Sequence, residues 1–451
     1  MVLRRVRCGG EQTVTRAGGR KSVFGKICTC GATWVARKPI RVIVSPDSNY
    51  NYSQMQMTPQ QTLDTWRAQT PGCHERVHLN NAGAALPPAS VVDTMTAHLS
   101  REARIGGYEA EAEAKSGIDD CYTRLGSLVG ASARNVAIVE NATVALAQAL
   151  SSFDFAPGDR IVTTRLDYPS NQLMYLSLAR RCGVEIVRAE DLPEGGVDPA
   201  SVAHLADHPR CRLVALTWVP TNCGTVQDAH GVGAVCESAG VPYVVDACQV
   251  VGQLPVDVEA LRCDFLAATG RKFLRGPRGI GFLYVSDRAL QRGAYPLYVD
   301  MRGAKWIASS DFQLADNARR FENWEFAYAL VLGLGEAARH ALEAGTAAMH
   351  RTQKLARALR ERLATVKNLE LMDRGAKTSA IVTVATGRDS SALVKQLRAL
   401  GVNTSASCRE DGVIDMDEKH QASILRLSPH YYNTEAELDV AVAALADLLK
   451  G

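Results

Sequence analysis

The sequence predicts an α/β fold, and two observations carry that prediction. From Val136 to Val285, short apolar runs typical of buried strands alternate with helical patterns, which favours a mostly parallel sheet covered by helices. After residue 320, a long helical segment is followed by strand, helix, strand and helix patterns, which predict a smaller α+β domain. We therefore expect residues 91–320 to form a large domain and residues 321–451 a small one, with residues 57–90 joining the small domain.

Composition limits the possible partners. The chain has 451 residues, is 46% hydrophobic and can bury a large core. No apolar run approaches the roughly 20 residues that a membrane span needs, so we expect no membrane partner. The formal charge of +3 is uneven, because residues 1–56 carry ten basic and two acidic residues, whereas the remainder has 41 basic and 46 acidic ones. This balance gives no reason to expect nucleic-acid binding.

The twelve cysteines are scattered, and most lie inside apolar strand or helix patterns. Buried reduced thiols of this kind are typical of a cytosolic protein, so we expect a cytoplasmic location and no disulfide framework. Cys28 and Cys30 are separated by one residue, and no second Cys or His pair stands at ligand spacing. We therefore expect no metal site.

Residues 1–56 are rich in Arg and Gly and show no periodicity sustained enough to predict a fold. We expect a disordered leader, or a translation start at Met55 or Met57, since MTPQQTLDTWRAQ has the pattern of a first helix. An organelle-targeting leader is the alternative, because the segment is Arg-rich and poor in acids. The lack of a clear amphipathic helix favours the first interpretation.

Two residues at strand ends indicate a chemistry. The apolar run FLAAT stops at Gly270, just before Lys272, and the earlier run PYVV leads into Asp246. Because open parallel sheets bind ligands at the carboxyl ends of their strands, we expect this lysine and this carboxylate to share a site. A lysine can form a Schiff base, and a carboxylate can keep a pyridine nitrogen protonated. The pair predicts pyridoxal phosphate as cofactor, although either residue alone is more often a surface lysine or a helix cap.

The motifs VVDACQ, ATGRKF and GPRGIGFLYV, in that order, resemble the class V aminotransferase family of fold-type I pyridoxal-phosphate enzymes. That family includes cysteine desulfurases, carbon-sulfur lyases and isopenicillin N epimerase. The resemblance runs from about His78 to the C-terminus. It implies the fold-type I architecture, a small amino-acid substrate and a homodimer whose sites lie at the subunit interface.

The resemblance also implies a set of cofactor-binding residues. The phosphate would lie at a helix start at Ala142 and Thr143, where backbone N–H groups are free, and Thr269 and Arg271 would also grip it. The ring of Tyr168 would stack on the cofactor. Asn222 and Gln249 would reach its phenolic oxygen. Thr143 and Asn222 could instead be ordinary helix caps.

Two further positions concern the substrate. Arg426 stands in the middle of a strand pattern, where an unpaired guanidinium would be costly, so it needs an anion. The resemblance implies that it binds the substrate α-carboxylate as a bidentate fork, in preference to a structural salt bridge. Asn81, in HLNNAGAALPP, would lie in a loop of residues 57–90 over the active site, or in an ordinary turn before the next helix.

The reaction remains open among several alternatives. The NNAGAA, GGY, RRFENWE and HYYNTE stretches resemble the lyase and epimerase-like branch, which makes β-elimination from a cysteine S-conjugate or sulfoxide the leading hypothesis. Cysteine desulfuration is the alternative, with Cys408 as nucleophile and a possible sulfur acceptor as partner. Desulfurases usually carry a histidine near Tyr168, and none is present. Transamination or epimerisation would use the same residues, and a non-catalytic scaffold is disfavoured because Lys272, Asp246 and Arg426 are all present.

Overall fold

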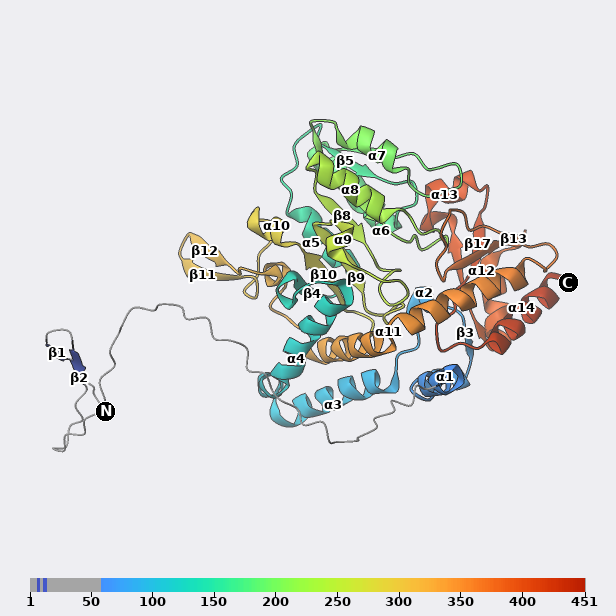
Figure 1. The fold of residues 1–451 in the computed structure, drawn as a ribbon, viewed down its shortest axis with the longest axis horizontal. Helices are drawn as coiled ribbons and strands as arrows, with labels where there is room; N and C mark the ends of the chain where they lie inside the picture. The colour runs from blue at the N-terminus through green and yellow to red at the C-terminus, as the bar shows by residue number, and fades with distance from the viewer. Residues whose placement is uncertain (1–5, 9–10, 14–57, 451) are drawn as a thin grey trace, which may run out of the picture. The chain divides into compact units, whose positions relative to one another are not determined.

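The computed structural model describes residues 6–8, 11–13 and 58–450, and the chain divides into two units, residues 1–56 and 57–451 (Figure 1). In the first unit, β1 (Val6–Cys8) pairs antiparallel with β2 (Glu11–Thr13), a hairpin that the sequence pattern does not predict. The expectations of a disordered leader, a later start or a targeting segment otherwise fall outside the described residues.

A seven-stranded sheet lies at the centre of the second unit, in the order β4-β10-β9-β8-β7-β5-β6. Strands β9, β8, β7, β5 and β6 are parallel, whereas β10 runs antiparallel to both β9 and β4. The predicted mostly parallel sheet is therefore confirmed. The strands are β4 (Val136–Val139), β5 (Arg160–Thr163), β6 (Glu185–Arg188), β7 (Cys211–Thr217), β8 (Tyr243–Asp246), β9 (Phe265–Thr269) and β10 (Gly281–Val285).

Alternate residues of these strands fill two cores, one on each face of the sheet. On β9, Leu266 and Ala268 belong to one core, and Phe265 and Ala267 belong to the other. The first face is covered by α4 (Gly107–Val129), α7 (Pro199–Ala206), α8 (Ala229–Ala239), α9 (Val258–Leu261) and α11 (Tyr328–Leu363). The second is covered by α5 (Ala142–Ser151), α6 (Pro169–Cys182) and α10 (Asp287–Gln291). Both faces are thus buried, which explains why the strand sequences are apolar throughout.

The C-terminal region contains a second, four-stranded antiparallel sheet in the order β13-β14-β17-β16. Its strands are β13 (Glu370–Leu371), β14 (Val382–Ala385), β16 (Ser405–Cys408) and β17 (Ser423–Leu427). Helix α12 (Ser390–Ala399) packs on β16 and β17, next to α14 (Glu435–Lys450), and α13 (Val413–Glu418) lies between β16 and β17 in the chain. These elements confirm the predicted α+β pattern.

The N-terminal segment of the second unit is tied to this C-terminal region. Helix α1 (Pro59–Ala68) begins at Thr58, whose hydroxyl accepts from the Gln61 N–H, and it confirms the first helix predicted there. Strand β3 (Val77–His78) then pairs in parallel with β15 (Val402–Asn403). This pairing connects the segment to the C-terminal region, and the assignment of residues 57–90 to the small domain stays a prediction.

Helix α11 connects the two regions. Its first half packs on α3 (Ala89–Ile105) and α4, and the helix is interrupted at Gly345, where φ is 55°. A positive φ is easily adopted by glycine, so this position can redirect the chain. The second half contacts α14 and β14. Because α11 belongs to both regions, the boundary at residue 321 stays a prediction.

Two elements differ from the sequence-based expectation. Residues Asn81–Ala84 form a one-turn helix, α2, inside the predicted loop. Strands β11 (Ala304–Ala308) and β12 (Asp311–Leu314) form a hairpin that no pattern predicts, and Figure 1 shows it projecting from the end of the unit that carries α10. Among the described residues, no helix is long and apolar enough to cross a membrane. The nine cysteines within residues 58–450 are free thiols.

Candidate active site

A cavity of about 250 Å³ opens at the carboxyl ends of the parallel strands. Strands β8 and β9 deliver Asp246 and Lys272 to this edge, and α5 and α6 begin there after β4 and β5. Seven of the residues predicted from the sequence line it: Ala142, Thr143, Tyr168, Asp246, Thr269, Arg271 and Lys272. The topology therefore brings together side chains that are up to 130 residues apart in the sequence.

Lys272 lies in the loop after β9 and is only 6% exposed. Burial lowers the pKa of its amine from the usual value, while the nearby Cys248 and Asp246 act in the opposite direction. Its Nζ lies 5.6 Å from the centroid of the Tyr168 ring. Among the described residues, this amine has no hydrogen-bond or salt-bridge partner, so it is available to react.

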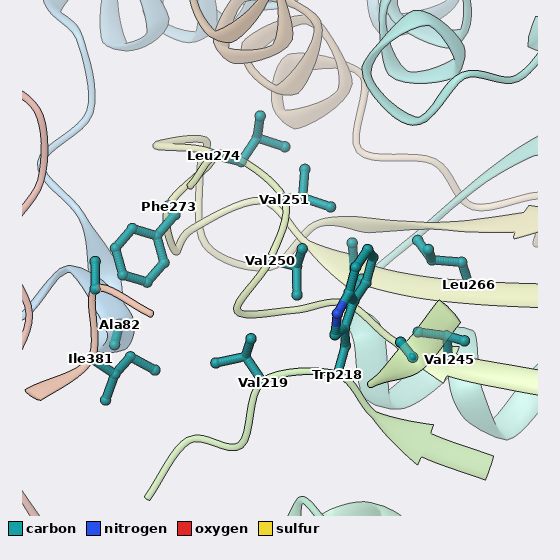
Figure 2. Packing of buried hydrophobic residues seen from close by; sticks show 14 of the residues in the cluster. Ala82, Trp218, Val219, Val245, Val250, Val251, Leu266, Phe273, Leu274 and Ile381 are labelled. Carbon is teal, nitrogen blue, oxygen red and sulfur yellow. The ribbon is translucent and has the colours of Figure 1, made fainter. Parts of the chain in front are cut away.

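The loop that carries Lys272 is fixed by its neighbours. The N–H of Arg275 donates to the Lys272 carbonyl over 2.8 Å, and Gly252, with φ of 96°, allows the chain to pass so close to Phe273 that any Cβ would collide. Figure 2 shows Phe273 and Leu274 packed in one buried cluster with Ala82 and Val251. The lysine is thus held on rigid backbone.

His430 connects this loop to the small domain. Burial lowers the pKa of His430 to about 3, so the imidazole is neutral at physiological pH. Its Nδ1 accepts from the Tyr431 N–H at 2.9 Å, which leaves Nε2 to donate to the Phe273 carbonyl at 2.9 Å. The residue after Lys272 therefore depends on a contact from the C-terminal region.

Asp246 ends β8, and both of its carboxylate oxygens are oriented by hydrogen bonds. Oδ1 accepts from the Cys248 N–H at 2.9 Å, and Oδ2 accepts from Asn171 Nδ2 at 3.0 Å. The carboxylate is 7% exposed and has no salt-bridge partner among the described residues. It is thus a buried, positioned anion at the cavity wall, as a partner for a pyridinium nitrogen must be.

The opposite part of the cavity is rich in donors suited to a phosphate. Asn141 caps α5 by accepting from the Val144 N–H at 3.0 Å, and the N–H groups of Ala142 and Thr143 in the first turn have no intrahelical partner. Arg271 lies on the same wall, donates to the Gly83 carbonyl, and has a pKa that is lowered by burial and by the adjacent Arg278. Concentrated positive charge of this kind favours an anionic ligand.

These features fit pyridoxal phosphate. A free lysine, a buried carboxylate, an aromatic ring and a helix N-terminus surround one cavity. Gln249 does not line this cavity. Its Oε1 is buried without a hydrogen-bond partner among the described residues, although its Nε2 donates to the Ala82 carbonyl and to Thr221 Oγ1, both at 3.1 Å. An unsatisfied buried amide oxygen is costly and marks a place where a ligand group is expected.

Arg426 lies on β17 and is buried beside the same site. Its Nε donates to Ser405 Oγ at 3.0 Å, and its Nη1 donates to the carbonyl and hydroxyl of Thr221 at 2.8 and 2.7 Å. Burial lowers the pKa of Arg426 to about 10, so the group stays charged at neutral pH. No carboxylate forms a salt bridge with it among the described residues, and Nη2 has no partner. The guanidinium is therefore held in place with Nη2 free, and its binding of the substrate carboxylate stays a prediction.

Five predicted site residues do not line the cavity, and two of them, Asn81 and Asn222, have side chains that bond elsewhere. The side chain of Asn81 donates from Nδ2 to the His78 and Ser428 carbonyls at 3.2 and 2.7 Å, and its Oδ1 accepts from the Tyr432 hydroxyl. Asn222 donates to Asp415 Oδ2 at 2.7 Å. With their polar groups engaged in this way, neither side chain lines the cavity, and their binding roles stay predictions.

Cys408 ends β16, whose residue Ser405 is paired with Arg426. Three residues of strand correspond to about 10 Å, and side chains alternate between faces, so Cys408 lies on the opposite face from Arg426. Its Sγ is 4.0 Å from Ser391 Oγ at the start of α12. The Cys408 N–H donates to Asp411 Oδ2 at 2.9 Å, and Asp411 is also the main nearby charge that raises the pKa of Arg426. The thiol is thus close to the site without lining the cavity.

Several residues at the site are not predicted from the sequence. Asn171 and Cys248 line the cavity, Asp167 lies directly behind it, and Thr221 and Ser405 orient Arg426. The signal for Asp167 and Asn171 is the stretch DYPSN, in which turn-forming residues at the end of a strand carry two extra polar side chains. Pairing of Arg426 with Ser405 depends on strand register, which the sequence does not reveal.

Comparisons with known proteins agree with this geometry. The Aminotransferase class-V family model matches residues 77–440. A probable cysteine desulfurase of Methanothermobacter thermautotrophicus is 27% identical over 394 residues, which cover 85% of this chain and 97% of that protein. A cysteine desulfurase of Yersinia pestis (strain Pestoides F) is 28% identical over 395 residues, which cover 83% and 93%.

Solved structures show the same fold. The apo cysteine desulfurase from Thermococcus onnurineus NA1 matches with a TM-score of 0.78 and 22% identity, over 86% of this chain and 98% of that one. The cystine C-S lyase C-DES, in complex with its reaction product cysteine persulfide, matches with a TM-score of 0.75 and 23% identity, over 84% and 99%. The predicted cofactor and fold type are confirmed: the chain belongs to the class V aminotransferase family of pyridoxal-phosphate-dependent enzymes.

Proposed function

We propose that this protein cleaves the carbon–sulfur bond of cysteine or a cysteine-derived amino acid, and that cysteine desulfuration is its first candidate reaction. The observation that carries the proposal is that Lys272 and Asp246 line one small cavity and that Arg426 is buried close enough to affect the charge of Lys272. On sequence grounds β-elimination is the leading hypothesis and desulfuration the alternative. The names of the curated relatives support the alternative more directly.

Different residues of the chain would bind the substrate, transfer a proton and supply a negative charge. When bound, pyridoxal phosphate draws electrons away from the α-carbon of an attached amino acid. The free Nη2 of Arg426 provides a donor for the substrate carboxylate, and the fixed guanidinium sets the orientation of the substrate. The amine of Lys272, with its lowered pKa, can take and return a proton at Nζ. Asp246 offers a buried negative charge at the wall of the cavity.

Desulfuration requires one more group. The Cys408 thiolate would attack the substrate sulfur, the bond between sulfur and the β-carbon would break, and alanine and a Cys408 persulfide would result. In the structure the thiol faces α12, so residues 405–412 must rearrange for the attack. The Asp411 carboxylate accepts a hydrogen bond from the Cys408 N–H and lies near Arg426. A substrate carboxylate bound to Arg426 would therefore weaken the attraction between Asp411 and Arg426 that holds residues 405–412 in place.

β-Elimination is the second candidate, and two observations favour it. Tyr168 occupies the position where desulfurases usually carry a histidine, and Cys408 does not line the cavity. In this reaction Lys272 removes the α-proton and the bond between the β-carbon and sulfur breaks, giving pyruvate, ammonia and a sulfur-containing product. No thiol of the protein takes part.

Product analysis distinguishes the two reactions. Purified holoenzyme is incubated with L-cysteine, a cysteine S-conjugate and a cysteine sulfoxide in the presence of a thiol reductant, and alanine, pyruvate and sulfide are measured. The comparison includes Cys408→Ala and, as a matched control, Cys182→Ala, a partly buried thiol at the end of α6. Alanine and sulfide that disappear only in Cys408→Ala would support desulfuration. Pyruvate formed equally by all three proteins would support β-elimination, and no sulfur product from any substrate would contradict carbon–sulfur cleavage.

We also propose that the protein acts as a homodimer. Large apolar side chains are exposed on and before the β11–β12 hairpin: Leu297 (66%), Tyr298 (82%), Met301 (65%), Trp306 (82%) and Ile307 (57%). A patch of this kind typically marks an interaction site. Light scattering of the purified protein tests the proposal, since a monomeric mass at micromolar concentration would contradict it.

A further inference from the structure

A second buried carboxylate, Asp167, lies behind the cavity. It follows β5, directly precedes Tyr168, and is 5% exposed. Its oxygens accept from Thr163 Oγ1 and the Tyr168 N–H, both at 2.7 Å, and from the Thr217 hydroxyl. Among the described residues no Lys, Arg or His forms a salt bridge with it. A buried anion with neutral donors and no counter-ion is unusual and calls for a functional explanation.

Asn171 connects this carboxylate to Asp246. The two residues Asp167 and Asn171 are four positions apart across the start of α6, which begins at Pro169. Asn171 Nδ2 lies 3.2 Å from Asp167 Oδ1 and 3.0 Å from Asp246 Oδ2, and Asn171 lines the cavity. One amide group therefore lies between two buried carboxylates that would otherwise repel each other.

The polar groups around Asp167 come from four elements, α6, β5, β7 and β8. Thr163 of β5 and Thr217 of β7 donate to it, Tyr175 of α6 lies nearby, and Asp246 of β8 faces it as a like charge. Burial raises the pKa of Asp167, and the hydrogen bonds from the two threonines oppose that effect. Lys272, which is close to Asp246 on the cavity wall, is the residue that would attach the cofactor. A cation bound beside Asp246 would reduce the electrostatic repulsion between the two carboxylates.

We propose that Asp167 and Asn171 are positioning residues for the cofactor: Asn171 fixes the Asp246 carboxylate, and Asp167 adds a second negative charge that keeps the cofactor's ring nitrogen protonated. This inference depends on cofactor binding and is independent of which sulfur reaction follows. It assigns a role to the polar residues of DYPSN on both sides of Tyr168.

The test measures the cofactor, with no substrate present. Asp167→Asn keeps the shape and removes the charge, and Asn171→Leu keeps the charge and removes the connection to Asp246. The matched control is Asp159→Asn, a buried carboxylate at the other end of β5 that accepts from Arg210 at 2.9 Å. Two quantities are recorded: the dissociation constant of pyridoxal phosphate from the apoprotein, and the pH midpoint of the visible absorption band of the holoprotein.

The proposal predicts a specific pattern. Both variants at the site should bind the cofactor about 10-fold more weakly, as expected for the loss of a hydrogen bond to a charged group. In Asp167→Asn the midpoint of the visible band should move to lower pH, because a negative charge that stabilises a protonated cofactor is missing. Asp159→Asn should change neither quantity.

Unchanged affinity and midpoint in folded Asp167→Asn would overturn the proposal, as would an equal change in Asp159→Asn, which would indicate a general disturbance of β5. If Asp167→Asn does not fold, the Asn171→Leu variant provides the test. Wild-type affinity for pyridoxal phosphate in that variant would contradict the positioning role. Weakened affinity accompanied by unchanged sulfur products would support the inference and leave the proposed reaction to its own test.

Discussion

The two walls of the active site differ in how firmly their side chains are held in place. On the large-domain wall, Lys272, Asp246 and Tyr168 end or follow strands of one sheet, and hydrogen bonds within that domain hold Asp246 and Tyr168. The loop of Lys272 is also held by His430 of the C-terminal region. On the small-domain wall, Arg426 is oriented by Thr221 across the boundary between the domains, and Cys408 points away from the cavity. The large domain thus builds a rigid cofactor site, whereas the reaction that follows depends on the less constrained wall.

The largest effect is expected at Lys272. Lys272→Ala should lower activity by about 10³-fold or more, because in the proposed reaction the amine would be both the attachment point and the general base. It should also remove the visible band that depends on the lysine. Lys395→Ala, on the exposed side of α12, is the control and should retain both. Substantial turnover by the Lys272→Ala variant would contradict the catalytic role of Lys272 on the large-domain wall.

A smaller effect is expected on the other wall at Arg426. Arg426→Ala should raise KM about 10- to 100-fold, because a charged hydrogen bond to the substrate carboxylate is lost, with a smaller change in kcat. Arg101→Ala, whose guanidinium is exposed and paired with Glu113 at 2.7 Å, should behave as wild type. A fall in kcat without any change in KM would assign Arg426 a structural role.

An ionisable group that packs against the large domain should affect stability without affecting chemistry. Glu322 is buried, accepts from the Ile138 N–H and the Tyr122 hydroxyl at 2.8 Å, and has a pKa raised to about 7 by burial. Because the folded state holds this proton more tightly than the unfolded state, stability should fall as pH rises from about 4.5 to about 7. Glu322→Gln should therefore be more stable than wild type at pH 8, on the order of 2 kcal/mol, and similar at pH 5.

Thermal unfolding at the two pH values measures this difference. The direction is the decisive result, since a variant that is less stable than wild type at pH 8 would contradict the raised pKa. Activity should be unchanged, because Glu322 lies outside the residues that line the cavity.

The smallest effect is expected at Tyr168. Tyr168→Phe should keep cofactor affinity, whereas Tyr168→Ala should weaken it by about 1 kcal/mol beyond the loss of buried area, since the ring would stack on the cofactor. Titration of the apoprotein with pyridoxal phosphate measures both. Equal affinity in Tyr168→Ala and wild type would contradict the stacking role that the sequence predicts.

The sequence predicts the rigid wall well because its signals are local. Lys272 and Asp246 each end an apolar run, and parallel strands bring such ends to one edge whatever the exact lengths of the connections. The same reasoning does not reach Asn171 or Asp167, because their roles depend on side-chain contacts between α6 and β8.

The small-domain wall could be predicted only in part. A guanidinium in a strand pattern indicates a bound anion, which identifies Arg426. Whether Cys408 reaches the substrate depends on strand register and on which face of the sheet the thiol occupies, and neither follows from a motif. Asn81 illustrates a related limit: its motif suggests a loop over the site, but the structure forms α2 there and engages the amide with Tyr432 and Ser428.

The most direct test of the account is mass analysis of the protein after reaction with L-cysteine in the absence of reductant. Desulfuration predicts that the peptide containing Cys408 gains one sulfur atom while alanine forms in equal amount. The peptide containing Cys182 should remain unmodified. Alanine-free conversion to pyruvate, with no sulfur added to Cys408, would contradict desulfuration and assign the reaction to β-elimination.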